Sequence, residues 1–202
     1  MAGLDRLLSK HLDHIIQENL GDKTIQKVEN RLVEKYGITL TESIEQFQKL
    51  DSVLREFFGA GAVGLEKRFL ENICNVKTTS DNSRILINNS ILTKIILEAF
   101  GDIDKKRIMD ILSSDALIIS QIIEKCDIAQ TSGYRKINSL IDDGLLVPSG
   151  YVSASDGKKV TKYRSVFDNV KIEIVRNDVK IAIRLAKEEF EASSVLSVCT
   201  QA

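Results

Sequence analysis

Residues 118–146 read IISQIIEKCDIAQTSGYRKINSLIDDGLL, and this stretch decides the fold that the sequence predicts. Isoleucine recurs at steps of three and four through its first part, which is typical of an amphipathic helix over about 118–126. Cys126, Asp127 and Ile128 form a short turn. A second helix is predicted over about 130–143, and one side of it carries the apolar or small residues Gly133, Ile137, Leu140 and Ile141. Two short helices joined by a tight turn indicate a helix-turn-helix.

The other side of the second helix carries a polar row, made of Gln130, Thr131, Tyr134, Arg135 and Asn138. Arg, Gln and Asn have paired polar atoms that match the guanine and adenine edges in the DNA major groove. Solvated helix faces show the same spacing without binding anything, so the row needs support from a neighbouring element. Glycine inside a helix costs about 1 kcal/mol relative to alanine, and we therefore expect the two helices to approach closely at Gly133.

A β-hairpin is predicted directly after this pair of helices. Residues 151–153 and 160–166 alternate with a period of two around the turn at Asp156 and Gly157, which is a hairpin signal. The hairpin concentrates positive charge, since it carries Lys158, Lys159, Lys162 and Arg164. Such charge suits a wing that neutralises DNA phosphates. Helices followed by a basic hairpin predict a winged helix-turn-helix.

The wider sequence predicts a mainly α protein of two units. Helices over about 4–20, 22–36, 41–58 and 60–76, joined by glycines, predict an amino-terminal four-helix unit. We expect a helical regulatory or interaction domain at 1–77, a linker at 78–89, the winged-helix domain at 90–192 and a flexible tail at 193–202. Residues 85–87 are alternatively a short edge strand, and residues 170–175 are a third strand or the start of a helix.

A carboxy-terminal helix is predicted from Asn177 to about Glu191. Its apolar positions Val179, Ala182, Ile183, Ala186 and Phe190 share one face and are the predicted dimerisation surface. A homodimer would present two recognition helices about 34–36 Å apart, one turn of duplex DNA.

Four segments of the second half resemble winged-helix regulators of the arsenic-repressor (ArsR) type. They are residues 97–112 (LEAFGDIDKKRIMDIL), 130–137, 143–146 and the basic hairpin at 157–163. The resemblance implies a dimeric, sequence-specific transcription regulator. It also implies that Gln130, Thr131, Ser132, Tyr134, Arg135 and Asn138 face the DNA groove, and that Lys158, Lys159 and Lys162 serve the wing. Two features depart from the family: Ala129 stands where a serine usually caps the recognition helix, and the metal-sensing cysteine pair is missing.

The first half, at residues 35–43 and 54–59, is similar to an archaeal helical module, the Nitrosopumilus-type output domain. This resemblance implies a regulatory or protein-binding domain at 1–77 without chemistry of its own, and therefore a protein partner for that domain.

Other classes of function find little support in the sequence. The chain has 202 residues and a net charge of −1, with no run of about 18 apolar residues that could span a membrane. An odd number of scattered cysteines, Cys74, Cys126 and Cys199, favours the reducing cytoplasm. His11 and His14 lie one helical turn apart but lack further ligands for zinc. We expect no catalytic constellation, metal or cofactor, and hence no enzyme.

Two hypotheses follow for the function. The first is a cytoplasmic, dimeric regulator that binds double-stranded DNA. The second is an adaptor whose winged helix docks a partner protein, which the near-neutral charge and the pair Asp142–Asp143 favour. Arg135 and the wing lysines favour the first. The operator, the target genes, the effector and the direction of regulation leave no signal in the sequence.

Overall fold

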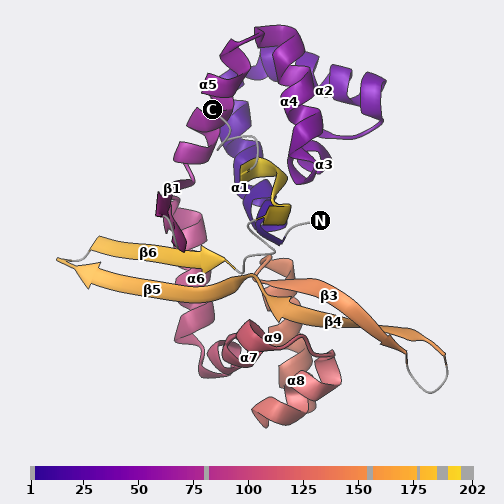
Figure 1. The fold of residues 1–202 in the computed structure, drawn as a ribbon, viewed down its shortest axis with the longest axis vertical. Coiled ribbons are helices and arrows are strands. Elements are labelled where there is room, and N and C mark those ends of the chain that lie inside the picture. Colours follow the sequence, from indigo (N-terminus) through magenta and orange to yellow (C-terminus); the bar gives the residue numbers. More distant parts are fainter. Residues whose placement is uncertain (1–2, 80–81, 154–156, 177, 186–190, 197–202) are drawn as a thin grey trace.

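The computed structural model describes residues 3–79, 82–153, 157–176, 178–185 and 191–196. The chain is mainly helical, with antiparallel strands in two sheets. Figure 1 shows a helical unit at one end, a second group of helices with a hairpin at the other, and a sheet between them. In the described residues no helix is both long and apolar enough to cross a bilayer.

The amino-terminal unit contains five helices rather than four. They are α1 (Gly3–Leu20), α2 (Asp22–Tyr36), α3 (Leu40–Glu45), α4 (Phe47–Phe58) and α5 (Gly61–Glu71). The single helix predicted over 41–58 is broken at Gln46, whose φ of −123° and ψ of 56° are not helical. Thr39 and Glu42 form a capping box that starts α3, so this short helix has its own amino-terminal signal.

Residues predicted as a linker form a β-hairpin instead. Strand β1 (Cys74–Thr79) pairs antiparallel with β2 (Asn82–Ile87), with Cys74 opposite Ile87. The helix predicted to reach residue 76 accordingly ends at Glu71. Ile85 and Ile87 are buried, and their alternation is the period of a strand. The strand is interior rather than at an edge, because β2 lies between β1 and β6.

The predicted carboxy-terminal helix is wrong over its described part. Residues 178–185 are strand β6 (Asp178–Leu185), which pairs with β2 and with β5 (Phe167–Val175). Ile181, Ile183 and Leu185 are buried while Asp178 and Lys180 are exposed, a burial period of two that defines a strand. Residues 170–175 are therefore strand, one of the two alternatives left open. The sheet has the order β1-β2-β6-β5.

The predicted dimerisation surface fails for the same reason. Ile183 is fully buried and lies between Ile85 and Val170 of the neighbouring strands, so it is part of the chain's own core. Val179 and Ala182 are half-buried in β6 and point to opposite faces of the sheet. Ala186 and Phe190 lie outside the described residues.

In its described residues the second half contains the helices α6 to α9, a short helical segment within 191–196 and the predicted hairpin. The helices are α6 (Ser90–Gly101), α7 (Ile103–Ser114), α8 (Ile119–Cys126) and α9 (Gln130–Asp142). The hairpin consists of β3 (Leu146–Ser153) and β4 (Lys159–Ser165). An isolated antiparallel bridge joins Leu117, just before α8, to Tyr163. α8, α9 and β4 lie within about one residue of their predicted positions, whereas β3 begins at Leu146 rather than near residue 151.

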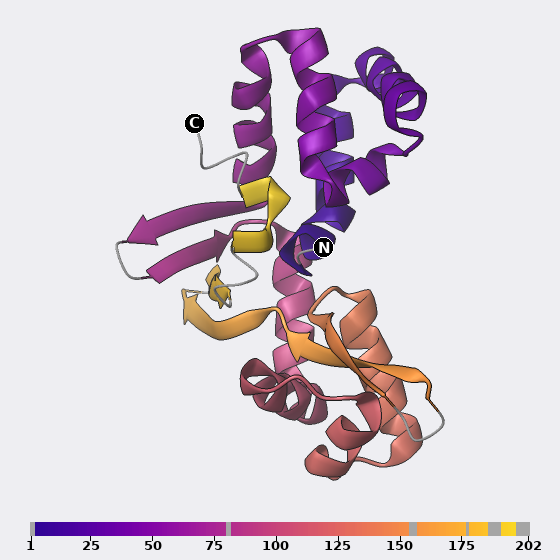
Figure 2. The ribbon, with the colours of Figure 1, turned by 45° about the vertical axis from the view of Figure 1, so that its right-hand side comes forward.

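Two contacts tie the halves together. A Cβ atom added at Gly144, which follows α9, would lie 3.0 Å from the Leu7 Cα of α1. Residues 191–196 return to the helical unit: Ser193 Oγ and Ser194 Oγ donate hydrogen bonds of 2.5 and 2.8 Å to the buried Asp5 carboxylate. Figure 2 shows this segment packed near α1. The prediction of a flexible tail is therefore wrong for residues 193–196, and residues 197–202 lie outside the described chain.

Candidate nucleic-acid interface

The turn between α8 and α9 is only three residues long. Asp127 ends α8 in the left-handed conformation, at φ 50° and ψ 51°, which Asp tolerates better than most residues. Its backbone N–H donates to the carbonyls of Glu124 and Ile123, and the half-buried Ile128 packs against the core. The tight turn fixes the angle between the two helices.

Gly133 is the contact point between these helices, as the sequence predicts. A Cβ atom at this position would lie 2.7 Å from Ile123 Cγ1 and 3.1 Å from Ile123 Cδ1. The first distance is shorter than real Cβ contacts and the second is tighter than most of them, so glycine lets α8 and α9 approach this closely. The contact explains why a poor helix former occupies the middle of α9.

Lys136 holds α9 against the first turn of α7. Its Nζ lies 2.6 Å from both carboxylate oxygens of Asp102 and 3.0 Å from Asp104 Oδ2, with the lysine side chain 15% exposed. The hydrogen bond from Lys136 lowers the pKa of Asp102, and Asp102 in turn raises the pKa of Lys136. Asp102 also accepts hydrogen bonds from the backbone N–H groups of Asp104 and Lys105 and so caps α7.

This anchor was not predicted from the sequence. From the sequence, a lysine on this helix is interpreted as another basic residue for the DNA groove. Its acidic partners give no local signal, because they lie 32 and 34 positions away in the chain. The available signal was Asp102 before a helix start, an N-cap pattern. Two further anchors work alongside it: Lys105 Nζ donates to Ser139 Oγ at 2.9 Å, and Arg107 donates to the Cys126 carbonyl at 2.8 Å.

Lys136 is held in ion pairs with Asp102 and Asp104, and the predicted polar row forms the outward side of α9. Its members Gln130, Thr131, Tyr134, Arg135 and Asn138 are all exposed, and Tyr134 is 41% exposed. Ser132, added by the family resemblance, is half-buried. The helix begins at Gln130 as predicted, although Ala129 provides no side-chain cap.

The hairpin carries its lysines on two faces. Lys158 and Lys159 are exposed and Lys162 is half-buried. Lys159 lies opposite Ser153 in the register, and Lys162 is three residues further along β4, so the two side chains leave opposite faces of the ribbon. Asp156, which belongs to the predicted turn, lies outside the described residues, while Gly157 adopts φ 79°. A register shift between Pro148 and Tyr151 bends β3.

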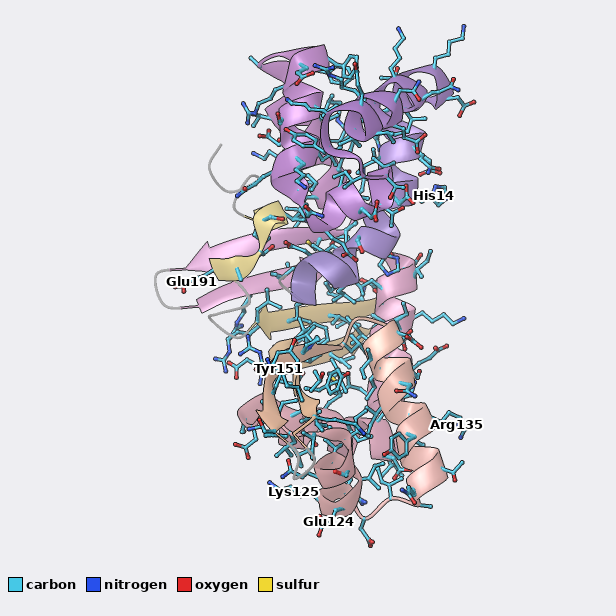
Figure 3. All side chains as sticks on the ribbon, turned by 90° about the vertical axis from the view of Figure 1, so that its right-hand side faces the viewer. His14, Glu124, Lys125, Arg135, Tyr151 and Glu191 are labelled. Carbon is cyan, nitrogen blue, oxygen red and sulfur yellow. The ribbon has the colours of Figure 1, made fainter. Side chains whose placement is uncertain are left out.

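Figures 2 and 3 place α9 and the hairpin next to each other. Figure 3 shows Arg135 projecting outward from α9 on one side of this half and Tyr151 on the hairpin toward the other side. Tyr151 is 65% exposed. The first-half helices lie at the other end of the molecule (Figure 1), away from this surface. The exposed row and the basic hairpin thus belong to two elements, α9 and the β3–β4 ribbon, that contact each other through β3.

Other groups considered in the sequence occupy structural positions. His14 is exposed and lies 3.8 Å from Glu18, whereas His11 is buried, although the leucine-striped helix that carries both would also allow it to face water. Burial raises the pKa of the Cys74 thiol to about 12 and also raises the pKa of Cys126, so both are poor nucleophiles. Gly59 joins α4 to α5. The described residues contain no group of three or more His, Cys, Asp or Glu placed to hold a metal ion.

Searches with protein-family models, against curated proteins and against solved structures found no match to this chain. The resemblances to the ArsR-type regulators and to the archaeal output domain therefore stay predictions.

Proposed function

We propose that the protein is a sequence-specific, DNA-binding transcription regulator whose second half acts as a winged helix-turn-helix. In this proposal α9 enters the major groove and the β3–β4 hairpin contacts phosphates beside it. The observation that carries the proposal is the exposed polar row of α9 next to the lysine-bearing hairpin. An α-helix fits the major groove of B-DNA, and side chains on its outward face reach the base edges.

The residues of α9 have different roles in this proposal. Arg135 is exposed and of the type that bonds guanine through two atoms, while Gln130 and Asn138 suit adenine. Lys136 sits in ion pairs with α7 and positions the helix without reading DNA. Base contacts therefore come from the row, and the anchors keep its orientation fixed.

The hairpin supplies the sequence-independent part of the binding. Lys158, Lys159 and Lys162 neutralise phosphates and release counterions. Because Lys159 and Lys162 leave opposite faces of the ribbon, the hairpin suits a position between two phosphate strands rather than flat on one. The amino-terminal unit, with the exposed side chains of Val33 and Phe57, serves as the domain that receives a protein partner.

Selection of bound fragments from random duplex DNA tests the proposal. The wild-type protein is expected to enrich a defined motif. Arg135→Ala should relax the preference at one base pair, by about 1–3 kcal/mol of discrimination. Lys94→Met is the comparison, because it removes an exposed positive charge of α6 outside the proposed interface, and the motif should stay the same. Failure of the wild type to enrich any motif would contradict the proposal.

One observation favours the adaptor as the second candidate. Tyr134 of α9 and Tyr151 of β3 are 41% and 65% exposed on two elements that contact each other, and exposed aromatic residues are frequent at protein interfaces. An adaptor would bind its partner protein through these side chains. In that case the variant Tyr151→Ala would abolish partner binding, and DNA binding would be absent in the wild type.

A further inference from the structure

The outer edge of β5 is an unpaired strand edge in the described part of the chain. β5 stands at the end of the order β1-β2-β6-β5, so only β6 pairs with it. Figure 1 shows the far ends of β5 and β6 projecting beyond α6. Ile174 and Val175 there are 70% and 51% exposed. A row of free backbone N–H and C=O groups is a template for pairing with another strand.

We propose that this edge pairs antiparallel with the β5 edge of a second copy of the chain, with Ile172 of the two copies opposite each other. The two copies then share one continuous sheet across a two-fold axis. The same surface serves both partners, as such symmetry requires. The proposed surface replaces the helical one predicted from the sequence.

Charge favours this register over its neighbours. With Ile172 on the axis, Lys171 of each copy lies opposite the partner's Glu173, which gives two favourable cross-strand pairs. Moving the axis by one residue places Lys171 opposite the partner's Lys171, or Glu173 opposite the partner's Glu173. Like charges directly opposite each other are destabilising. Charged residues on an edge strand usually disfavour pairing with another strand. Here Lys171 and Glu173 disfavour the two shifted registers and favour the register with Ile172 on the axis.

The two side chains are available for these contacts. Lys171 and Glu173 are 60% and 51% exposed, and within one copy they already lie 2.7 Å apart. The second carboxylate oxygen of Glu173 and the remaining donors of the ammonium group allow each to take a further partner. The pair across the axis therefore adds to the pair within the strand.

The apolar face of the same strand is also complementary to itself. In the proposed register Val170 lies opposite the partner's Ile174, on the face that also carries Ile172. Val170 borders a hollow of about 250 Å³ whose lining includes Phe100 and Met109. The exposed Ile174 of one copy would thus be covered beside the hollow of the other.

Sedimentation equilibrium of the full chain without DNA tests the proposal, so the result does not depend on DNA binding. The wild type is expected to show a monomer–dimer equilibrium below about 100 µM, within the range of small interfaces. Lys171→Glu and Glu173→Lys should each raise the dimer Kd at least tenfold. The double swap K171E/E173K should restore it to within about threefold, because it rebuilds both cross-strand pairs.

Sedimentation equilibrium of a mixture of the Lys171→Glu and Glu173→Lys variants is the decisive experiment. Each single variant opposes like charges in its homodimer, but a mixed dimer opposes Lys to the partner's Glu at both positions, so the mixture should associate. Lys94→Glu, the same charge change at an exposed position of α6, is the control and should leave Kd within about threefold. Ile174→Asp should weaken association without changing the circular dichroism spectrum, since the side chain is 70% exposed.

Three results would overturn the proposal. The wild type could stay monomeric over the whole concentration range. It could dimerise with a Kd that neither single variant changes, which would place the interface elsewhere. The single variants could weaken association while neither the double swap nor the mixture restores it, which would show that the charges act within one copy only.

Discussion

Gly133 shows how one residue sets the geometry of the candidate interface. We predict that Gly133→Ala destabilises the protein by about 1–2 kcal/mol, because overpacking against Ile123 outweighs the better helix propensity of alanine. Urea denaturation measures this. The double variant Ile123→Ala/Gly133→Ala should lose less unfolding free energy than the sum of the losses of the two single variants, since Ile123→Ala removes the clashing atoms. Simple additivity of the two changes would contradict the close-contact account.

Glu66 is a second residue whose environment leads to a prediction. It is 1% exposed in α5, beside Asp51, which is held by Arg55 at 2.5 Å. Burial, together with the charge and hydrogen bond of Asp51, raises the pKa of Glu66 to about 8. The protonated carboxyl therefore donates a hydrogen bond to Asp51 at neutral pH.

The sign of the pH effect follows from that shift. A carboxyl whose pKa is higher in the folded state stabilises the fold fully below its unfolded pKa near 4.5, and this stabilisation is lost as pH rises through about 8. Glu66→Gln keeps the donor and cannot ionise. It should be more stable than the wild type by about 1–3 kcal/mol at pH 8.5, and the difference should disappear near pH 4. Parallel stability curves of the two proteins from pH 4 to 9 would count against a raised pKa.

At the scale of elements, the helices α8 and α9, the turn between them and the hairpin were predictable, and the central sheet was not. The apolar periods of α8 and α9, the short turn and the Asp156–Gly157 pair of the hairpin are all local signals. The sheet depends on pairing between residues about 100 positions apart, as between Ile85 and Ile183. Such pairing leaves no local pattern.

The segment that became β6 shows why the helical prediction was wrong there. Val179, Ala182 and Ile183 fit a helical stripe as well as part of a strand, because a short apolar run satisfies both periods. The burial of Ile181 and Leu185 distinguishes the two, and this is visible only once β2 and β5 are in place. For the candidate interface, the exposed row was predictable and the Lys136 anchor was not, since its partners are distant in sequence.

The carboxy-terminal segment gives a prediction at this scale. Val195 and Leu196 are buried against the helical unit, and Ser193 Oγ also accepts a hydrogen bond from the Leu196 backbone N–H. Leu196→Ala should lower the free energy of unfolding by about 2–4 kcal/mol, through lost burial and the cavity left behind. Differential scanning calorimetry measures the change. Glu191→Gln, at an exposed position, is the control. If Leu196→Ala changes the free energy of unfolding as little as this control does, the segment does not stabilise the fold.

At the scale of the whole molecule, the chain separates a helical unit at one end from the candidate DNA surface at the other, with the sheet between them (Figure 1). Contacts of α1 with Gly144 and with Ser193 join the two ends. α1 therefore reaches from the helical unit to Gly144, just beyond the end of α9. The proposed β5 edge lies on the central sheet, apart from the row of α9, so a dimer would leave both recognition helices exposed.

The salt dependence of binding to duplex DNA tests the central claim most directly. If the hairpin lysines contact phosphates, the logarithm of the binding constant falls linearly with the logarithm of salt concentration, by about 0.9 per phosphate contact. Changing Lys158, Lys159 and Lys162 together to alanine should then reduce the magnitude of this slope by about 2–3, while Lys94→Met, at an exposed position of α6, should leave it unchanged. A slope that is the same in the wild type and the triple variant, or a wild type that binds no duplex at low salt, would contradict the account.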